Sequence, residues 1–565
     1  MNTRITRAIS ISGFIAIAVS HLASCSSRST DCHWNENCES SAGGQGTAGD
    51  SNGGAQFGGN ASGGSSHSGG STTSTVTTAT TCSGLPKDAC SIDETFGVFV
   101  SPLGNDASAG TETAPVASLR KALEMAATPR NGKKRSVFVC ASAGEFKLTE
   151  TLLIDASVDG VSLYGGFDCS DETSWILPAT PTPSRIASAS PVAVKLLRIG
   201  SEIHVENLSI TAADADASTA PGSSSIAMLI AESPNVQLAK VDLIAGKGAT
   251  GKAGTSYADL APMVGTSGVD GLKACLTGVG APQTQIQCEG APAPSVGGRG
   301  GDGATLTSTT ADKPGFNGEN GLVAPDPNPD GKGAGGFGEV TEMCKAGTDG
   351  IAGANGASAE GGKGTGDLTQ DGYVGVDGKP GNAGKPGQGG GGGGGAKAPK
   401  ACTTAASTTT PTHGASGGSG GTGGCGGKGG GAGQGGGASF ALAIVNSGVS
   451  LKDCHLTANR AGNGGMGGPA QGGGAGGLGG RGADGYGSSS LPSCDGGKGG
   501  RGGAGSPGGG GAGGPSAAIA WVGTAATVSS SVLKFSSEAA AGGTDGSGST
   551  VAAGSQGNTA EQLQL

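Results

Sequence analysis

The stretch GGSGGTGGCGGKGGG, residues 417–431, repeats Gly-Gly-X with a period of three. Two of every three positions carry no side chain, so this segment cannot bury an apolar face of its own. Such a triplet suits an extended helix with three residues per turn, whose bare sides pack against like neighbours. The alternative is a disordered chain, the usual state of glycine-rich sequence. The sequence leaves both open and predicts that this segment is displayed from another, folded part.

Composition excludes a single conventional domain. Glycine accounts for 120 of the 565 residues, whereas an ordinary soluble domain contains about 7% glycine. Only 34% of the residues are hydrophobic and 3% are aromatic, so one continuous globular core is not expected. The net charge is −10 and the basic residues are scattered, which argues against a nucleic-acid partner.

Residues 1–24 have the features of a signal peptide. Arg4 and Arg7 precede an apolar run at 8–19, which is too short to span a bilayer permanently. The LASC sequence that ends at Cys25 resembles the lipobox of bacterial lipoproteins. This resemblance implies that Cys25 becomes the lipidated N-terminus, and the two serines that follow favour the outer membrane. The alternative is a secretory peptide with an incidental cysteine.

Residues 25–82 are rich in Gly, Ser and Thr, which predicts a flexible tether between the membrane and the rest of the chain. The 14 cysteines fit an oxidising compartment. Their local spacings indicate disulfide candidates, with the pairs Cys32–Cys38, Cys82–Cys90 and Cys275–Cys288. Closely spaced Cys or His pairs are missing, so we expect neither a structural metal nor a cofactor.

An internal repeat is the main fold signal. The sequences IHVENLSI (203–210), VQLAKVDL (236–243) and VSLKDCHL (449–456) carry inward-type residues at offsets 0, 2, 5 and 7, and ATVSSSVL (526–533) is a weaker copy. In each copy, two pairs of alternating residues lie on either side of a two-residue bend and direct four side chains inward. A single coil cannot bury this face, so the coils must stack. The repeat predicts an all-β chain with a right-handed parallel β-helix.

The alternative fold is a β-sandwich of similar short strands. Its strands would be joined by tight hairpin turns such as Asn-Gly, which are missing between the copies. In the β-helix, the glycine-rich material begins at an equivalent place after each copy, so long loops would leave from one face. The predicted division is an N-terminal β-helix part at 83–245, further coils at 438–460 and 516–541, glycine-rich insertions at 246–437 and 461–515, and a flexible tail at 542–565.

Two sequence resemblances support this architecture. The stretch VFVSPLGNDASAGTETAPVASLRKAL (98–123) resembles the N-terminal part of the pectate-lyase-like β-helix superfamily, and VSLYGGFDCS (161–170) extends it. The resemblance implies the fold but not an activity, because that superfamily contains lyases, hydrolases, epimerases and non-catalytic surface proteins. The glycine-rich insertions resemble PGRS-type bacterial surface repeats in composition.

A catalytic site would require particular residues at equivalent outward positions of neighbouring coils. The superfamily resemblance implies acidic calcium ligands with a basic residue for a lyase, and a glycosidase needs two carboxylates. No outward position repeats a carboxylate, and one candidate cluster remains: Asp242, Asp453 and His455. Scattered solvated charges are the alternative interpretation. We therefore expect a non-catalytic surface lipoprotein, with a polysaccharide lyase or hydrolase as the alternative.

Two glycine-rich nonapeptides raise the question of calcium. GGRGADGYG (479–487) fits the pattern G-G-x-G-x-D-x-U-x, and GGRGGDGAT (297–305) nearly does, with Asp484 and Asp302 at the acidic position. That motif binds calcium when repeated in tandem, and these copies stand alone. The partners we expect are the membrane, through the lipid anchor, and extracellular polysaccharide or other surface proteins.

Overall fold

The computed structural model describes residue 82 and residues 85–565, apart from 131, 172–173, 308–312, 324–328, 405–406, 410 and 489. Residues Ala79–Leu565 form one compact unit. The signal peptide, the lipidation site Cys25, the tether before Cys82 and the pair Cys32–Cys38 lie outside the described residues. Within the described part of the chain, every helix is too short or too polar to cross a bilayer.

The described chain is mostly β, and three parallel sheets contain most of its strands. Sheet 1 has the spatial order β1 (Gly97–Val100), β2 (Ser136–Cys140), β5 (Leu163–Phe167), β8 (Ile203–Glu206), β11 (Val236–Ala239), β22 (Val449–Lys452) and β25 (Thr527–Ser529). Sheet 2 has β3 (Glu145–Leu148), β6 (Ser184–Ser188), β9 (Leu208–Thr211), β12 (Asp242–Ile244), β23 (His455–Thr457) and β26 (Val532–Lys534). Sheet 3 has β4 (Leu152–Asp155), β7 (Val192–Leu197), β10 (Ser225–Ala231), β21 (Ser439–Val445), β24 (Ser516–Val522) and β27 (Thr559–Gln564).

The remaining elements are short. One α-helix, α1, covers Leu119–Ala127, and the 3₁₀ turns are η1 (Ala89–Ser91), η2 (Ala156–Val158) and η3 (Pro329–Gly331). Four antiparallel pairs are β13 (Thr284–Ile286) with β14 (Ser295–Gly297), β15 (Thr305–Leu306) with β20 (Thr412–His413), β16 (Asp367–Thr369) with β17 (Gly372–Val374), and β18 (Cys402–Thr404) with β19 (Ser407–Thr409).

The chain passes through the three sheets in a repeating order. After β8 in sheet 1 it forms β9 in sheet 2 and β10 in sheet 3, and it returns to sheet 1 as β11. The repeat copies pair at the same offsets, because Val236 lies between Ile203 and Val449 in adjacent strands. This parallel, sequential topology is compatible with a parallel β-helix.

The bend between sheets 1 and 2 uses residues in the left-handed region. Positive φ occurs at equivalent positions in four coils: Asn207, Lys240, Asp453 and Ser530. One left-handed residue turns the chain sharply, and the residues on both sides, such as Val205 and Leu208, remain buried. Asn and Asp tolerate this conformation, whereas Lys at the same position costs about 1 kcal/mol.

Helix α1 covers one end of the core. Its buried residues Leu119, Ala122 and Leu123 join the main hydrophobic cluster. The helix begins after Ser118, whose hydroxyl accepts the Lys121 N–H at 3.2 Å.

Asp106 connects a preceding turn to this helix start. Its carboxylate accepts the N–H groups of Ala117 at 2.9 Å and Ser118 at 2.8 Å, and also the Ser118 hydroxyl. Burial raises the pKa of Asp106, but the hydrogen bonds and the Lys121 charge together hold that pKa below 3.8.

We expect Asp106→Ala to lower the free energy of unfolding by about 1 kcal/mol at neutral pH, since the carboxylate is exposed and screened. Because the folded pKa is depressed, this stabilisation is complete above the unfolded pKa and disappears as the pH falls through the folded pKa. Urea unfolding at pH 7 and at pH 3 measures the difference. An equal difference between variant and wild type at both pH values would contradict the assignment.

The central strands of sheet 3, β10 and β21, are buried on both faces. The hairpin β16–β17 lies on its outer face, where Leu368 and Tyr373 form a second hydrophobic cluster with Phe440. The Tyr373 hydroxyl donates to the Thr365 carbonyl at 2.6 Å, and burial raises the pKa of Tyr373 far above its ordinary value. This cover explains why the strands of sheet 3, such as β10, are apolar at consecutive positions.

The C-terminal residues differ from expectation. The predicted flexible tail at 542–565 is wrong, because β27 pairs in parallel with β24 and Ser555 donates its N–H to the Gly362 carbonyl. The tail therefore adds a strand to sheet 3 and a further glycine segment beside the others.

The described cysteines form five disulfides: Cys82–Cys90, Cys140–Cys169, Cys275–Cys402, Cys288–Cys425 and Cys344–Cys494. The expected partner of Cys82 is thus observed, whereas the predicted pairing of Cys275 with Cys288 is wrong. Each of these two cysteines bonds to a segment that lies beside it in space but more than a hundred residues away in sequence. Cys454 is buried and carries the free thiol among the described cysteines.

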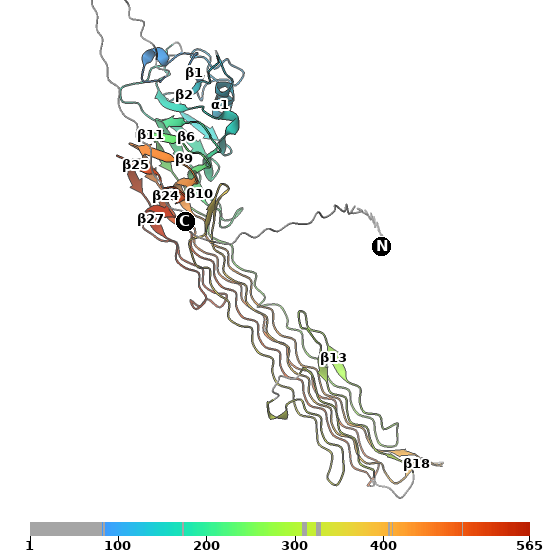
Figure 1. The fold of residues 1–565 in the computed structure, drawn as a ribbon. Helices are drawn as coiled ribbons and strands as arrows, with labels where there is room; N and C mark the ends of the chain where they lie inside the picture. The colour runs from blue at the N-terminus through green and yellow to red at the C-terminus, as the bar shows by residue number, and fades with distance from the viewer. Residues whose placement is uncertain are drawn as a thin grey trace, which may run out of the picture. The chain divides into compact units, whose positions relative to one another are not determined.

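The glycine-rich segments, residues 246–437, 461–515 and 539–558, form one structure that we call the glycine bundle. The two long segments begin after strands β12 and β23 of sheet 2, and both end at strands of sheet 3. In Figure 1 they run side by side as long wavy traces that extend away from the three sheets, past β13 to β18. Long-range backbone hydrogen bonds connect them along their length.

Candidate functional site

The structure brings two of the three candidate catalytic residues together. Asp242 in β12 and His455 in β23 are neighbours in the register of sheet 2, and His455 Nδ1 lies 2.9 Å from Asp242 Oδ1. The His455 side chain is 65% exposed and the Asp242 side chain 34%. This is a solvent-accessible pair on the outer surface of the sheet.

The neighbourhood of this pair does not contain a second carboxylate in register. Asp242 lies between Ser209 and His455, and the next residue in the row is Val532. Asp453 occupies the left-handed bend before β23, and among the described residues the hydrogen bond of the pair joins Asp242 and His455 without it. The residues present therefore do not make the two-carboxylate arrangement of a glycosidase.

A cavity lies beside the start of α1. It has a volume of about 440 Å³ and its lining includes Arg120, Glu145 and Glu150. Both carboxylates are paired with arginines, Glu150 with Arg120 at 2.6 Å and Glu145 with Arg185 at 3.6 Å. These ion pairs favour a structural role for the two carboxylates over acid–base chemistry.

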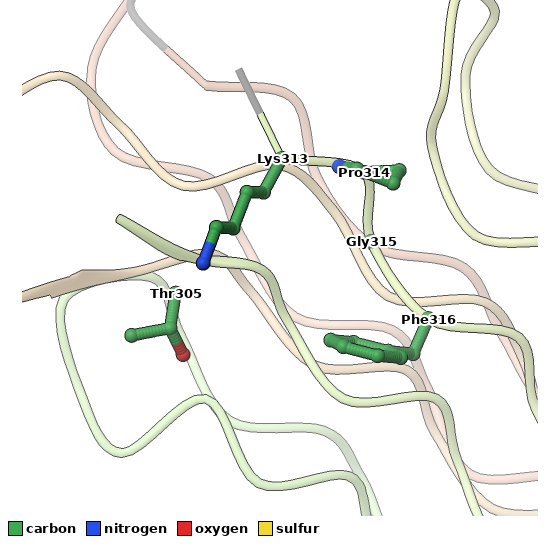
Figure 2. Close-up of a pocket in the computed structure, with 5 residues that line it drawn as sticks. All are labelled: Thr305, Lys313, Pro314, Gly315 and Phe316. Carbon is green, nitrogen blue, oxygen red and sulfur yellow. The ribbon is translucent and has the colours of Figure 1, made fainter. Parts of the chain in front are cut away.

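Figure 2 shows a smaller cavity in the glycine bundle, of about 200 Å³, lined by Thr305, Lys313, Pro314, Gly315 and Phe316. The Lys313 amine extends toward Thr305, and the Phe316 ring lies on another side of the cavity. One amine, one hydroxyl and an exposed ring can contact a small polar ligand, but these groups do not include a carboxylate or a nucleophile–base pair.

The two weak calcium candidates are engaged with cationic side chains. Asp302 pairs with Arg299 and accepts the Gly280 N–H, and Asp484 lies 3.2 Å from the Lys273 amine. Across the described residues, no group of three His, Cys, Asp or Glu side chains is placed to hold a metal ion.

The glycine bundle is the most extensive structural feature, and residues 414–436 lie at its centre. Every third residue of this segment contacts the same neighbour. Gly418, Gly421 and Gly424 donate their N–H groups to the 494–500 stretch, whereas Gly417 and Gly420 donate to the 298–301 stretch. This period of three is that of an extended threefold helix.

The third face of the central segment carries the X residues of the triplets. The hydroxyls of Ser416, Ser419 and Thr422 accept the N–H groups of Leu272, Val269 and Thr266 at 2.7–2.8 Å, while their own N–H groups bond to the carbonyls of the same three residues. The small hydroxyl side chains thus act as extra acceptors between two backbones.

The central segment is therefore buried from 414 to 425, and for this part the expectation that the run at 417–431 is displayed is wrong. From 416 to 425 every backbone N–H has a hydrogen-bond partner. In an ordinary core, apolar side chains fill the interior, but here backbone groups do so directly. Each buried N–H and C=O needs a partner, and the threefold packing provides one.

The glycine content follows the number of covered faces. At 389–395 the X residue is also glycine, and this run is buried throughout. A Cβ at Gly389, Gly390 or Gly391 would overlap the carbonyl oxygen of a different neighbour in each case. Where all three faces meet a neighbouring backbone directly, every position is glycine. In the central segment the third face meets its neighbour through the buried hydroxyls of Ser419 and Thr422.

The threefold packing of the bundle leaves little room for large apolar side chains. Several are consequently exposed on the segment at 260–279, including Leu260, Met263, Val264 and Leu276. The sequence signal for this surface is a cluster of apolar residues at non-glycine positions of the triplets.

The comparisons with known proteins add little to this geometry. No protein-family profile and no curated protein matches the chain. Among solved structures, the chain is similar to a rhamnogalacturonan lyase, with 17% sequence identity and a TM-score of 0.18, over 27% of this chain. The match spans only 39% of that protein, and a similarity at this level carries no argument about function.

Proposed function

We propose that this chain is a non-catalytic lipoprotein of the outer membrane or cell surface. A lipid on Cys25 and the tether at 25–82 hold a right-handed parallel β-helix. The β-helix presents the glycine bundle as a stiff projection for adhesion, matrix contacts or envelope structure.

The observation that carries this proposal is the hydrogen bonding inside the bundle. All backbone N–H groups at 387–396 and 416–425 are bonded, mostly to neighbouring segments. Three disulfides connect the segments laterally, at Cys275–Cys402, Cys288–Cys425 and Cys344–Cys494. Such an assembly resists bending and has little room for catalytic side chains, which suits a projection better than an enzyme.

Labelling in cells tests the anchor and the display. We expect labelled palmitate on the wild-type chain in the outer-membrane fraction and none on Cys25→Ala. A membrane-impermeant amine reagent should modify the exposed Lys498 of the bundle on intact cells. Modification of Lys498 only after lysis would contradict surface display, and lipid on Cys25→Ala would contradict the anchor.

The Asp242–His455 hydrogen bond supports one alternative, a polysaccharide lyase or hydrolase. We expect no new polysaccharide ends when the protein is incubated with acidic and neutral polysaccharides, with or without calcium. Cleavage that is lost in Asp242→Asn but kept in Glu206→Gln, a second exposed ion-pair carboxylate, would overturn the non-catalytic proposal.

We also expect Asp242→Asn to change the free energy of unfolding by less than about 0.5 kcal/mol, because an exposed ion pair contributes little. Urea unfolding measures the change. A loss of several kcal/mol would show that the pair is a structural element of sheet 2.

A further inference from the structure

The outer segment at 260–272 has free backbone groups at every third residue. Gly265, Gly268 and Gly271 donate their N–H groups to carbonyls of the neighbouring 475–481 segment. Thr266, Val269 and Leu272 donate to the hydroxyls of the central segment. The remaining residues of each triplet, Val264, Ser267 and Asp270, make no hydrogen bond through their N–H or C=O within the described part of the chain.

On several other segments of the bundle, side chains accept the third N–H of the triplet. Asp349 accepts the Lys498 N–H at 2.7 Å and Asn355 accepts the Ala504 N–H at 2.9 Å. Asparagines also accept the N–H groups of a neighbouring segment at the pairs Asn317–Gly338 and Asn320–Gly335. Such side chains block the approach of another backbone. Among the described residues, no side chain accepts the N–H groups of Val264, Ser267 and Asp270.

The outer edge of the bundle that residues 260–272 form is also apolar and carries little charge. Val264 is 60% exposed, and Leu260, Val269 and Leu272 are exposed beside it. The single charged side chain between 260 and 272 is Asp270, whose carboxylate accepts the Arg481 N–H at 2.7 Å. Burying this edge therefore removes apolar area from water, and its one carboxylate, Asp270, already accepts a hydrogen bond.

We propose that this edge binds the same edge of a second copy of this chain. Free donors and acceptors at every third residue match a partner backbone with the same period, and the edge itself has that period. A two-fold axis would pair 260–272 with its counterpart, extend the hydrogen bonding found inside the bundle and cover the apolar side chains of both copies. This pairing does not depend on lipidation or on the proposed surface role.

Proline substitution tests the backbone contact directly, because proline fits an extended threefold helix but has no N–H. The variant Val264→Pro/Ser267→Pro removes two outward donors. Ala352→Pro is the matched control. Ala352 is exposed on another segment, its N–H likewise makes no hydrogen bond among the described residues, and it lies away from large exposed apolar residues. Val269→Glu tests the apolar contact if the double variant does not fold.

Sedimentation velocity of the chain from Ser26 onward, over a range of micromolar concentrations, measures the association. We expect a concentration-dependent dimer for the wild type and for Ala352→Pro, and a dissociation constant raised at least about tenfold for the double variant and for Val269→Glu. A wild type that stays monomeric overturns the proposal. So does a dimer that the edge variants leave unchanged.

Discussion

Gly473→Ala should strongly destabilise the glycine bundle, whereas Gly472→Ala should not. A Cβ at Gly473 would overlap the carbonyl oxygen of Gly502 in the adjacent segment, and a Cβ at Gly472 meets no heavy atom within 4 Å. The two segments must separate to admit the methyl group, and a hydrogen bond between them, from Gly502 to Gly474, is then strained or broken. We expect a loss of about 2–4 kcal/mol in local stability.

The adjacent position provides a strict control. Gly472→Ala reduces the conformational freedom of the unfolded chain at no steric cost, so it should be neutral or stabilise the bundle by up to about 1 kcal/mol. Hydrogen exchange of peptides from 471–480 and 496–506 compares both variants with the wild type. Equal exchange in Gly472→Ala and Gly473→Ala would contradict the packing of these segments.

Removing the Cys288–Cys425 disulfide should have the second large effect. This bond fixes the central segment to the β13–β14 hairpin and joins residues 137 apart in sequence. In the chain-entropy model a loop of this length contributes about 5 kcal/mol, an upper value because the other disulfides already restrict the same segments. We expect Cys288→Ser/Cys425→Ser to open the distal part of the bundle while the three sheets stay folded.

Cys454 reports on the sheets in the same experiment. It is buried in the main hydrophobic cluster, and burial raises the pKa of its thiol, so it should resist alkylation in the folded chain. Peptide mapping after alkylation should find Cys454 protected in the double variant, with faster hydrogen exchange at 284–300 and 416–430. Alkylated Cys454 would mean that the bundle and the sheets unfold together, and unchanged exchange would show that the disulfide adds no stability.

The sequence predicts the strands better than the bundle. The offsets of 203–210, 236–243 and 449–456 give the correct register, because inward side chains must align when parallel coils stack. The extent of sheet 3 is harder to predict. Its outer face is covered by β16–β17, a hairpin that lies inside the glycine-rich sequence far from the strands it contacts.

The glycine segments contain no apolar pattern from which burial can be predicted. Their order depends on which segments become lateral neighbours, and a period of three fits every neighbour equally well. For the same reason the partner of Cys275 could not be found from spacing, since Cys402 reaches it across the bundle. In retrospect, the change from Gly-Gly-X to seven consecutive glycines at 389–395 indicates the most enclosed segment.

The candidate residues Asp242 and His455 were placed correctly as neighbours by the repeat, because they occupy the same offset in copies that adjoin in sheet 2. Asp453 was grouped with them only through closeness in sequence. The left-handed bend at Asp453 separates its position from the row that contains Asp242 and His455.

Hydrogen exchange of the wild-type chain, read at 387–396 and 416–425, tests most directly whether the bundle is an ordered structure held by its backbone. Every N–H in these stretches has a partner and the segments lie at the centre. We therefore expect these amides to be protected as strongly as those of β10 and β21 in sheet 3. Exchange at the rate of an unfolded glycine chain, with β10 and β21 still protected, would contradict the ordered bundle and the projection built on it.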